Sequence, residues 1–140
     1  MTAPLTVLIA SPLEPDLVAR IAAADPAARV EYHPDLLPTI RYPADHGGIR
    51  PTLTDEQDAR WSELLAQADI LFDFDWRDPA ALPSTSPRVR WVQASSAGIG
   101  AFMSRTGLAD SGVAFTTAAG VHAVPPVSYT HLTLPTNREV

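Results

Sequence analysis

The stretch Val89-Arg-Trp-Val-Gln-Ala-Ser-Ser-Ala-Gly-Ile-Gly100 decides the fold of this chain. Its first five residues include two valines and a tryptophan, a composition typical of a buried strand. The residues that follow carry almost no side-chain bulk, and we expect them to turn into the start of a helix. Glycine in such a turn lets a ligand approach the backbone closely, and amides that precede a helix attract anions. The stretch therefore predicts a strand–turn–helix unit that can receive a small anion.

Apolar runs of strand length recur along the rest of the chain. These further strand candidates are Thr6–Ala10, Ala28–Tyr32, Ile70–Phe74 and Val113–Thr117. Between two of them, Thr54 and Gln57 form a capping-box pattern ahead of an apolar face, which predicts a helix from about residue 55 to 68. A short helix is expected over Ile99–Ser104, ending near Thr106-Gly107.

The first helix is expected directly after the first strand. Ser11 there offers an N-cap, and Pro12 would occupy the first helical position. Apolar residues then continue at helical spacing as far as Asp25-Pro26. The segment Pro34–Pro51 is predicted to be a long surface connection.

Strands that alternate with helices predict an α/β fold, with a flavodoxin-like or Rossmann-like open parallel sheet covered by helices on both faces. The sheet is expected to be incomplete at the C-terminus. In sheets of this kind ligands bind beyond the carboxyl ends of the strands. This rule selects four segments: Ser11-Pro12, Asp73–Arg77, Ala94–Gly98 and Ala118–Val121.

The composition excludes several classes of function. With 140 residues and a hydrophobic fraction of 46%, the chain is expected to form one globular domain, with neither a membrane span nor a signal peptide, in the cytoplasm. A formal charge of −6 argues against nucleic acid and anionic membranes as partners. The chain contains no cysteine and no lysine, which excludes disulfides, thiolate metal sites, P-loops and Schiff-base chemistry.

Three segments carry a resemblance to a known family. They are Arg90–Ile99 with its small-residue turn, the strand at Gly112–Thr117, and Ala119–Pro125. In this order, and with the capped helix and the strand before them, they resemble the N-terminal, substrate-binding domain of the D-isomer-specific 2-hydroxyacid dehydrogenases. The resemblance covers roughly residues 5–125.

The resemblance implies a site and a reaction. In that family the backbone amides of the small-residue turn hold the carboxylate of the substrate. Carried over by position, Ser96, Ala97 and Gly98 would bind a small 2-keto or 2-hydroxy acid. The parent protein would be an oxidoreductase that interconverts such acids with NAD or NADP, and a homodimer.

The chemical groups of that reaction are not found in this sequence. It contains no G-x-G-x-x-G fingerprint, so no cofactor-binding residue is assigned, and NAD or NADP is expected only in the full-length parent. The family's catalytic Arg and His–Glu pair lie in or beyond its cofactor domain, so no catalytic or metal-binding residue is assigned. His33, His46 and His122 are interpreted as loop or interface residues. We expect the chain to be inactive alone.

The C-terminal residues differ in character from the rest. Residues 1–126 are expected to form the partial substrate-binding domain, whereas residues 127–140 contain no alanine and are broken again by Pro135. Val127–Thr136 resembles a translated sequencing adapter, so we interpret 127–140 as a non-native tail. Because helices of the family's domain return after its cofactor domain, an apolar face is expected to be exposed here, with a tendency to aggregate.

The remaining polar residues admit other interpretations. The alternative function is a stand-alone flavodoxin-like module that binds a small molecule without redox chemistry. Asp73 and Asp75 could bind Mg²⁺ or accept a phosphoryl group, but without a lysine they are interpreted as acids that solvate a strand end. Arg77 could meet an acidic substrate, although a surface arginine is the favoured interpretation. Ser95 and Ser96 lack the G-x-S-x-G pattern of hydrolase nucleophiles.

Overall fold

A computed structural model describes residues 4–45, 47–96 and 98–118, and within them the chain forms a five-stranded sheet with parallel pairing throughout. The strand order is β2-β1-β3-β4-β5, so the chain adds a neighbour on one side of β1 before it builds the other side. The flavodoxin-like α/β fold expected from the sequence is confirmed.

The strands are β1 (Thr6–Ile9), β2 (Arg29–Glu31), β3 (Ile70–Phe72), β4 (Trp91–Gln93) and β5 (Ala114–Thr116). The α-helices are α1 (Pro15–Ala24), α2 (Asp55–Gln67), α3 (Leu82–Thr85) and α4 (Gly100–Thr106). Three 3-10 helices complete the description: η1 (Pro34–Leu36), η2 (Pro79–Ala81) and η3 (Leu108–Asp110). All five predicted strands are present, but each is shorter than its apolar run because the run continues into the adjoining turn.

The core lies on the side of the sheet that α2 covers. Leu8, Leu71 and Val92 stand level with one another in β1, β3 and β4, and all three are fully buried. The helices complete this core with Trp61, Leu65, Leu82, Met103 and Leu108. Burial of these large side chains supplies the main driving force for folding.

Helix α2 begins as the sequence predicts. The Thr54 hydroxyl accepts a hydrogen bond from the Gln57 amide at 3.1 Å, and the Gln57 side chain accepts one from the Thr54 amide at 3.0 Å. This capping box satisfies two of the amides that a helix leaves without partners at its start. The apolar side of the helix then packs Trp61 and Leu65 onto the sheet.

Helix α1 begins later than predicted. Glu14 is its N-cap and Pro15 its first residue, so the expected cap at Ser11 with Pro12 behind it is wrong. The reason lies in Pro15, because a proline holds the residue before it in an extended conformation, and Glu14 has that conformation. Ser11 and Pro12 instead belong to the non-helical connection between β1 and α1.

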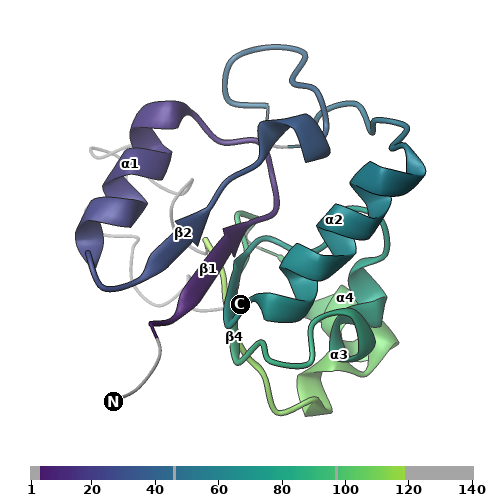
Figure 1. The fold of residues 1–140 in the computed structure, drawn as a ribbon. Helices are drawn as coiled ribbons and strands as arrows, with labels where there is room; N and C mark the ends of the chain where they lie inside the picture. Colours follow the sequence, from purple (N-terminus) through teal and green to yellow (C-terminus); the bar gives the residue numbers. More distant parts are fainter. Residues whose placement is uncertain (1–3, 46, 97, 119–140) are drawn as a thin grey trace, which may run out of the picture.

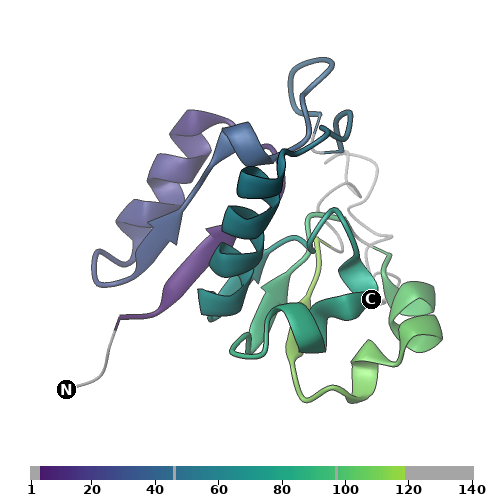
Figure 2. The same ribbon diagram turned by 45° about the vertical axis from the view of Figure 1, so that its right-hand side comes forward.

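The two long helices lie on opposite sides of the sheet. Leu17 and Ile21 of α1 line a shallow groove together with Phe72, which alternates with the core residue Leu71 along β3. In Figures 1 and 2, β1 and β2 lie between α1 and α2. No residue of α1 is buried, whereas α2 buries two.

The remaining helices are short. Helix α4 ends at Gly107, whose positive φ of 75° forms a left-handed C-cap, as the sequence indicated. Four-residue α3 and the 3-10 helices were not predicted, because such short elements have no detectable apolar periodicity. Within residues 4–45, 47–96 and 98–118, no helix has the length and apolar character needed to cross a membrane.

Candidate functional site

A cleft of about 490 Å³ opens at the carboxyl ends of the strands. It is lined by segments that follow three neighbouring strands: Ser11 and Pro12 after β1, residues 74–76 after β3, and Ser96 and Gly98 after β4. The chain leaves β1 toward β2 on one side and β3 toward β4 on the other, so a crevice forms between them. Three of the four segments selected from the sequence therefore meet in one cleft.

The backbone amides in the turn after β4 fall into two groups: those bonded to neighbouring segments and those of residues that line the cleft. The Ala94 amide pairs with the Thr116 carbonyl of β5, and the Ser95 amide donates to Asp73 Oδ1 at 2.6 Å. Ser96 and Gly98 line the cleft, and the part of the chain that is described contains no acceptor for their amides. Ala97, the third predicted residue, lies outside the described residues.

Asp73 holds this turn in place. It follows β3 with a φ of 70°, a left-handed conformation that is uncommon for residues other than glycine. Its amide donates to the Gln93 carbonyl, and its carboxylate binds the Ser95 amide. Asp73 therefore joins the ends of β3 and β4, and the interpretation of this acid as one that only solvates a strand end is corrected.

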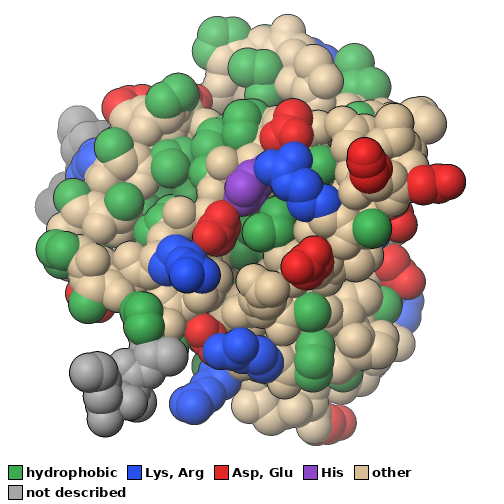
Figure 3. Space-filling view, viewed as in Figure 1, with side chains coloured by type: hydrophobic (Ala, Val, Ile, Leu, Met, Phe, Trp, Pro, Cys, Tyr) green, Lys and Arg blue, Asp and Glu red, His purple; other side chains and the backbone are tan. Residues whose placement is uncertain are grey.

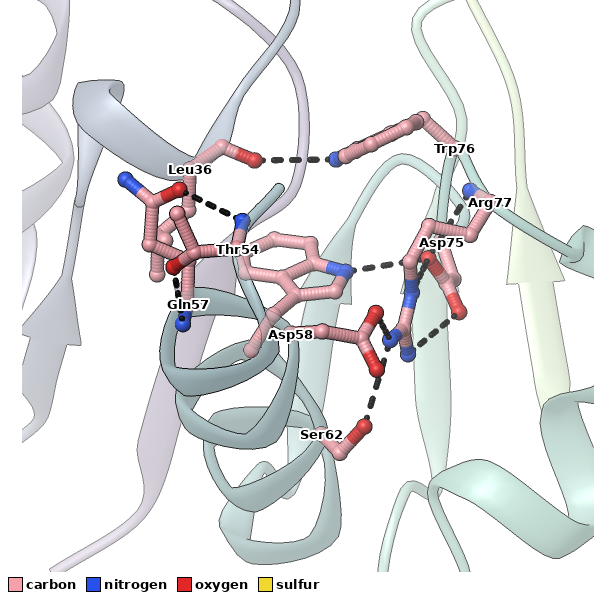
Figure 4. Close-up of polar contacts among 9 residues, drawn as sticks. Leu36, Thr54, Gln57, Asp58, Ser62, Asp75, Trp76 and Arg77 are labelled. Carbon is pink, nitrogen blue, oxygen red and sulfur yellow. Dashed lines mark hydrogen bonds and ion pairs between the residues drawn. The ribbon is translucent and has the colours of Figure 1, made fainter. Parts of the chain in front are cut away.

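Asp75 is turned away from solvent into a hydrogen-bonded network. Its side chain is about 2% exposed, and Oδ1 accepts from the Trp61 indole and from the Arg77 backbone amide, both at 3.0 Å. The Arg77 guanidinium contacts both carboxylate oxygens at 3.3 Å (Figure 4). This carboxylate is buried and bonded to protein donors through both oxygens, so the interpretation of Asp75 as a solvated acid is wrong.

Arg77 is committed to this network. Its guanidinium also donates to Asp58 at 2.8 Å and to Ser62 at 3.2 Å (Figure 4). Burial alone would lower the pKa of Arg77, but the hydrogen bonds and charges of Asp75 and Asp58 outweigh it and raise the pKa above its usual value. Arg77 is therefore neither a freely solvated surface arginine nor available to an acidic ligand.

The basic side chain that the described residues do place at the cleft is Arg50, which the sequence analysis did not single out. The connection that carries it is tied by a two-residue bridge, in which Thr39 and Ile49 exchange backbone hydrogen bonds of 2.9 and 2.8 Å. Gly48 is needed beside the bridge: its φ is +67°, and an added Cβ would lie 2.8 Å from the Thr39 carbonyl oxygen.

Asp45 stabilises the same connection from inside. Its buried carboxylate accepts hydrogen bonds from Arg41 and from the amides of Gly47 and Gly48. The bonds from the Arg41 side chain and the Gly48 amide hold the pKa of Asp45 well below its usual range. The long surface connection predicted over Pro34–Pro51 thus has a buried anchor at Asp45, and Arg50 near its end lines the cleft. A position in an irregular loop has no sequence periodicity, so no pattern could have indicated it.

Ser11 contributes a polar atom without a partner. The residue lines the cleft and is about 6% exposed, and its hydroxyl makes no hydrogen bond within the described part of the chain. Since a buried hydroxyl without a partner is costly, such an atom at a cleft is a candidate for binding a ligand. The sequence analysis selected this position by its place after β1 but assigned the hydroxyl to a helix cap.

His33, the one histidine among the described residues, does not line the cleft. His33 Nδ1 accepts from Arg60 at 2.8 Å, which leaves Nε2 to donate to Glu31, also at 2.8 Å. His46 and His122 lie outside the described residues, as does the segment 127–140.

The face in Figure 3 presents acidic and basic side chains side by side and not a patch of one sign. Among the residues described, no cluster of three or more acidic or histidine side chains could hold a metal ion.

The site thus combines a buried hydroxyl, two backbone amides and one arginine around a cleft at the switch point of a parallel sheet. All of these groups are hydrogen-bond donors, as an anion requires. Comparison with models of known protein families finds no match, and comparison with curated proteins finds none.

Proposed function

We propose that this chain binds the carboxylate of a small 2-keto or 2-hydroxy acid in the cleft, as the substrate-binding part of an NAD(P)-dependent oxidoreductase. The observation that carries the proposal is the convergence of donors: Arg50, Ser11 and the turn at Ser96 and Gly98 come from three separate segments and line one cleft. The resemblance of the sequence to D-2-hydroxyacid dehydrogenases supports the same ligand class.

The chain's own residues would bind and orient the acid. The Arg50 guanidinium supplies positive charge and a planar set of donors that matches a carboxylate. Ser96 and Gly98 supply backbone amides that need no side-chain ordering, and Ser11 can donate its hydroxyl proton. Asp75 lines the same cleft, but its charge is paired with Arg77 and would oppose an anion less than a free carboxylate.

Hydride transfer would be supplied by nicotinamide held elsewhere in the parent protein. The 140-residue sequence has no dinucleotide fingerprint, and none of the donors at the cleft is a proton-transfer group that ordinarily titrates near neutral pH. The proposal therefore assigns acid binding, and not the redox step, to this chain. A stand-alone acid-binding module would have the same cleft. Assaying the full-length parent protein for NAD(P)-dependent conversion of 2-keto or 2-hydroxy acids distinguishes that alternative from the present proposal.

Binding is tested by titrating the 140-residue chain with pyruvate and following amide chemical shifts by NMR. We expect the largest shifts at Ser96, Gly98 and Arg50. Arg50→Gln should weaken pyruvate binding at least about tenfold, because a charged hydrogen-bond partner is lost. The matched control is Arg90→Gln, since Arg90 is also exposed but precedes β4, at the opposite end of the strand.

Equal binding by wild type and Arg50→Gln, or shifts confined to residues away from the cleft, would contradict the assignment of the site. In a separate assay the chain alone should not oxidise NADH with glyoxylate, pyruvate or hydroxypyruvate. Measurable turnover would show that the redox step had been wrongly placed outside this chain.

A further inference from the structure

We infer that the acid bound in this cleft carries an apolar side chain of about ring size, and is not a two- or three-carbon acid. This inference rests on the proposed function and adds the substrate class. It starts from four large apolar residues that line the cleft together with the donors: Phe74, Trp76, Ile99 and Phe102. We call these four residues the apolar wall.

The apolar wall is held in a fixed arrangement. The Phe74 ring meets the Phe102 ring edge-on at 5.2 Å between centroids, and on another side it stacks with Phe115 at 6.0 Å. These distances are those of favourable aromatic pairs, so the rings are positioned before any ligand arrives. A preformed surface of this kind loses little conformational entropy when it binds an apolar group.

Trp76 presents hydrocarbon to the cleft because its polar atom is already used. The indole N–H donates to the Leu36 carbonyl oxygen at 3.1 Å (Figure 4). Its neighbour Asp75 is engaged by Trp61 and Arg77. The wall therefore has no free polar atom on Trp76 that a small hydrophilic acid would satisfy.

The volume of the cleft also favours an acid larger than a three-carbon keto acid. A volume of about 490 Å³ falls within the range of ordinary ligand pockets, roughly 300–1,000 Å³. A three-carbon keto acid has six heavy atoms and, at roughly 30 Å³ for each, would fill less than half of it. Such an acid, bound at Arg50 and Ser96, would leave the apolar wall in contact with water, which is unfavourable.

The lining of the cleft thus combines two chemistries: donors at Arg50, Ser11 and Ser96, and hydrocarbon at the apolar wall. A molecule that satisfies both has a carboxylate at one end and a ring or branched chain at the other. Phenylpyruvate has this form, and pyruvate is the same keto acid without the ring.

The test compares these two acids by calorimetric titration of the full 140-residue chain, with 3-phenylpropanol as a ligand that has the ring but no carboxylate. We expect phenylpyruvate to bind roughly tenfold or more tightly than pyruvate, because even one methylene in an apolar pocket discriminates about tenfold. The alcohol should bind more weakly than phenylpyruvate, since it has no charge for Arg50.

Phe102→Leu separates contact with the ligand from general packing. Leucine keeps an apolar side chain on α4 but removes the ring, so phenylpyruvate affinity should fall several-fold while pyruvate affinity stays unchanged. Arg50→Gln should weaken both acids by similar factors, because it acts on the carboxylate that they share.

The outcomes distinguish the two proposals. Pyruvate binding as tightly as phenylpyruvate, or Phe102→Leu weakening both acids equally, would overturn the inference and leave acid binding standing. If neither acid binds the wild-type chain, the proposed function itself fails. Equal affinity for phenylpyruvate and 3-phenylpropanol would contradict both proposals, because the carboxylate would then contribute nothing to binding.

Discussion

The two faces of the sheet differ by one residue along each strand and yet are covered very differently. On one face Leu8, Leu71 and Val92 form a row across three strands, and each is 0% exposed under α2 and its neighbours. On the other face the next row contains Trp91, which is 39% exposed although it lies in a strand between two others.

The row of side chains under α2 is therefore buried more evenly than the other face, where Ile9 of β1 is 0% exposed but Trp91 is not buried. α2 buries Trp61 and Leu65, whereas α1 buries none of its residues. A parallel sheet ordinarily has both faces covered, so a half-exposed tryptophan on an interior strand is unusual.

Removing a large side chain under α2 should cost most. Leu65→Ala deletes a fully buried side chain and leaves a cavity, so we expect the free energy of unfolding to fall by about 3 kcal/mol. Ile21→Ala on the partly exposed α1 is the matched control and should cost about 1 kcal/mol or less. Urea denaturation measures both, and equal losses would show that the two faces are covered alike.

The indole N–H groups of two tryptophans test the same contrast with polar contacts. Asp75→Ala removes the acceptor of buried Trp61 and the charge partner of Arg77, and should cost about 3 kcal/mol. Asp75→Asn keeps an acceptor oxygen and should cost less. Trp91→Phe removes a comparable bond to Thr116 on the exposed face and should change stability by no more than about 0.5 kcal/mol. Chemical denaturation measures the free energy of unfolding of each variant. A larger loss for Trp91→Phe than for Asp75→Ala would show that the polar contact on the exposed face contributes more, contrary to this prediction.

The helix starts provide the smallest test. Thr54→Ala removes the cap of α2 and should lower the free energy of unfolding by about 1 kcal/mol. Glu14→Ala at the start of α1 removes no cap bond and deletes a buried carboxylate oxygen without a partner in the described part of the chain. It should therefore be neutral or slightly stabilising. Thermal denaturation of the two variants side by side checks this difference, and a loss at Glu14 equal to that at Thr54 would contradict it.

The parts of the fold that the sequence could predict are those with a repeating physical signal. The strands appear as apolar runs, and α2 appears as a capping box followed by an apolar face, so all five strands and this helix were found. The start of α1 was misplaced because two prolines, Pro12 and Pro15, both suit a first helical position. The conformational restriction that Pro15 places on Glu14 decides between them, and the apolar spacing alone does not reveal it.

The candidate site was predictable in place but not in detail. Parallel strands end at one edge of the sheet, so Ser11, Ser96 and Gly98 could be assigned to that edge from order alone. Arg50 could not, because its position depends on a bridge between Thr39 and Ile49 in an irregular loop. Asp75 and Arg77 were misjudged for the same reason: their partners, Trp61 and Asp58, lie on α2, more than a dozen residues earlier.

The position of β1 between β2 and β3 in the sheet has a consequence for how the chain folds. β1 pairs with β3, and the Thr6 amide is bound by Asp69, 63 residues further along the chain. That pairing requires a long loop to close before any of its hydrogen bonds form, and the entropy of closure opposes it. We therefore expect β1, α1 and β2 to come together early, because they are close in sequence. β3 should pair with β1 later and more slowly. Until β3 pairs with it, one edge of β1 keeps unpaired backbone groups. The risk of aggregation during synthesis is therefore larger than the contacts of the folded chain suggest.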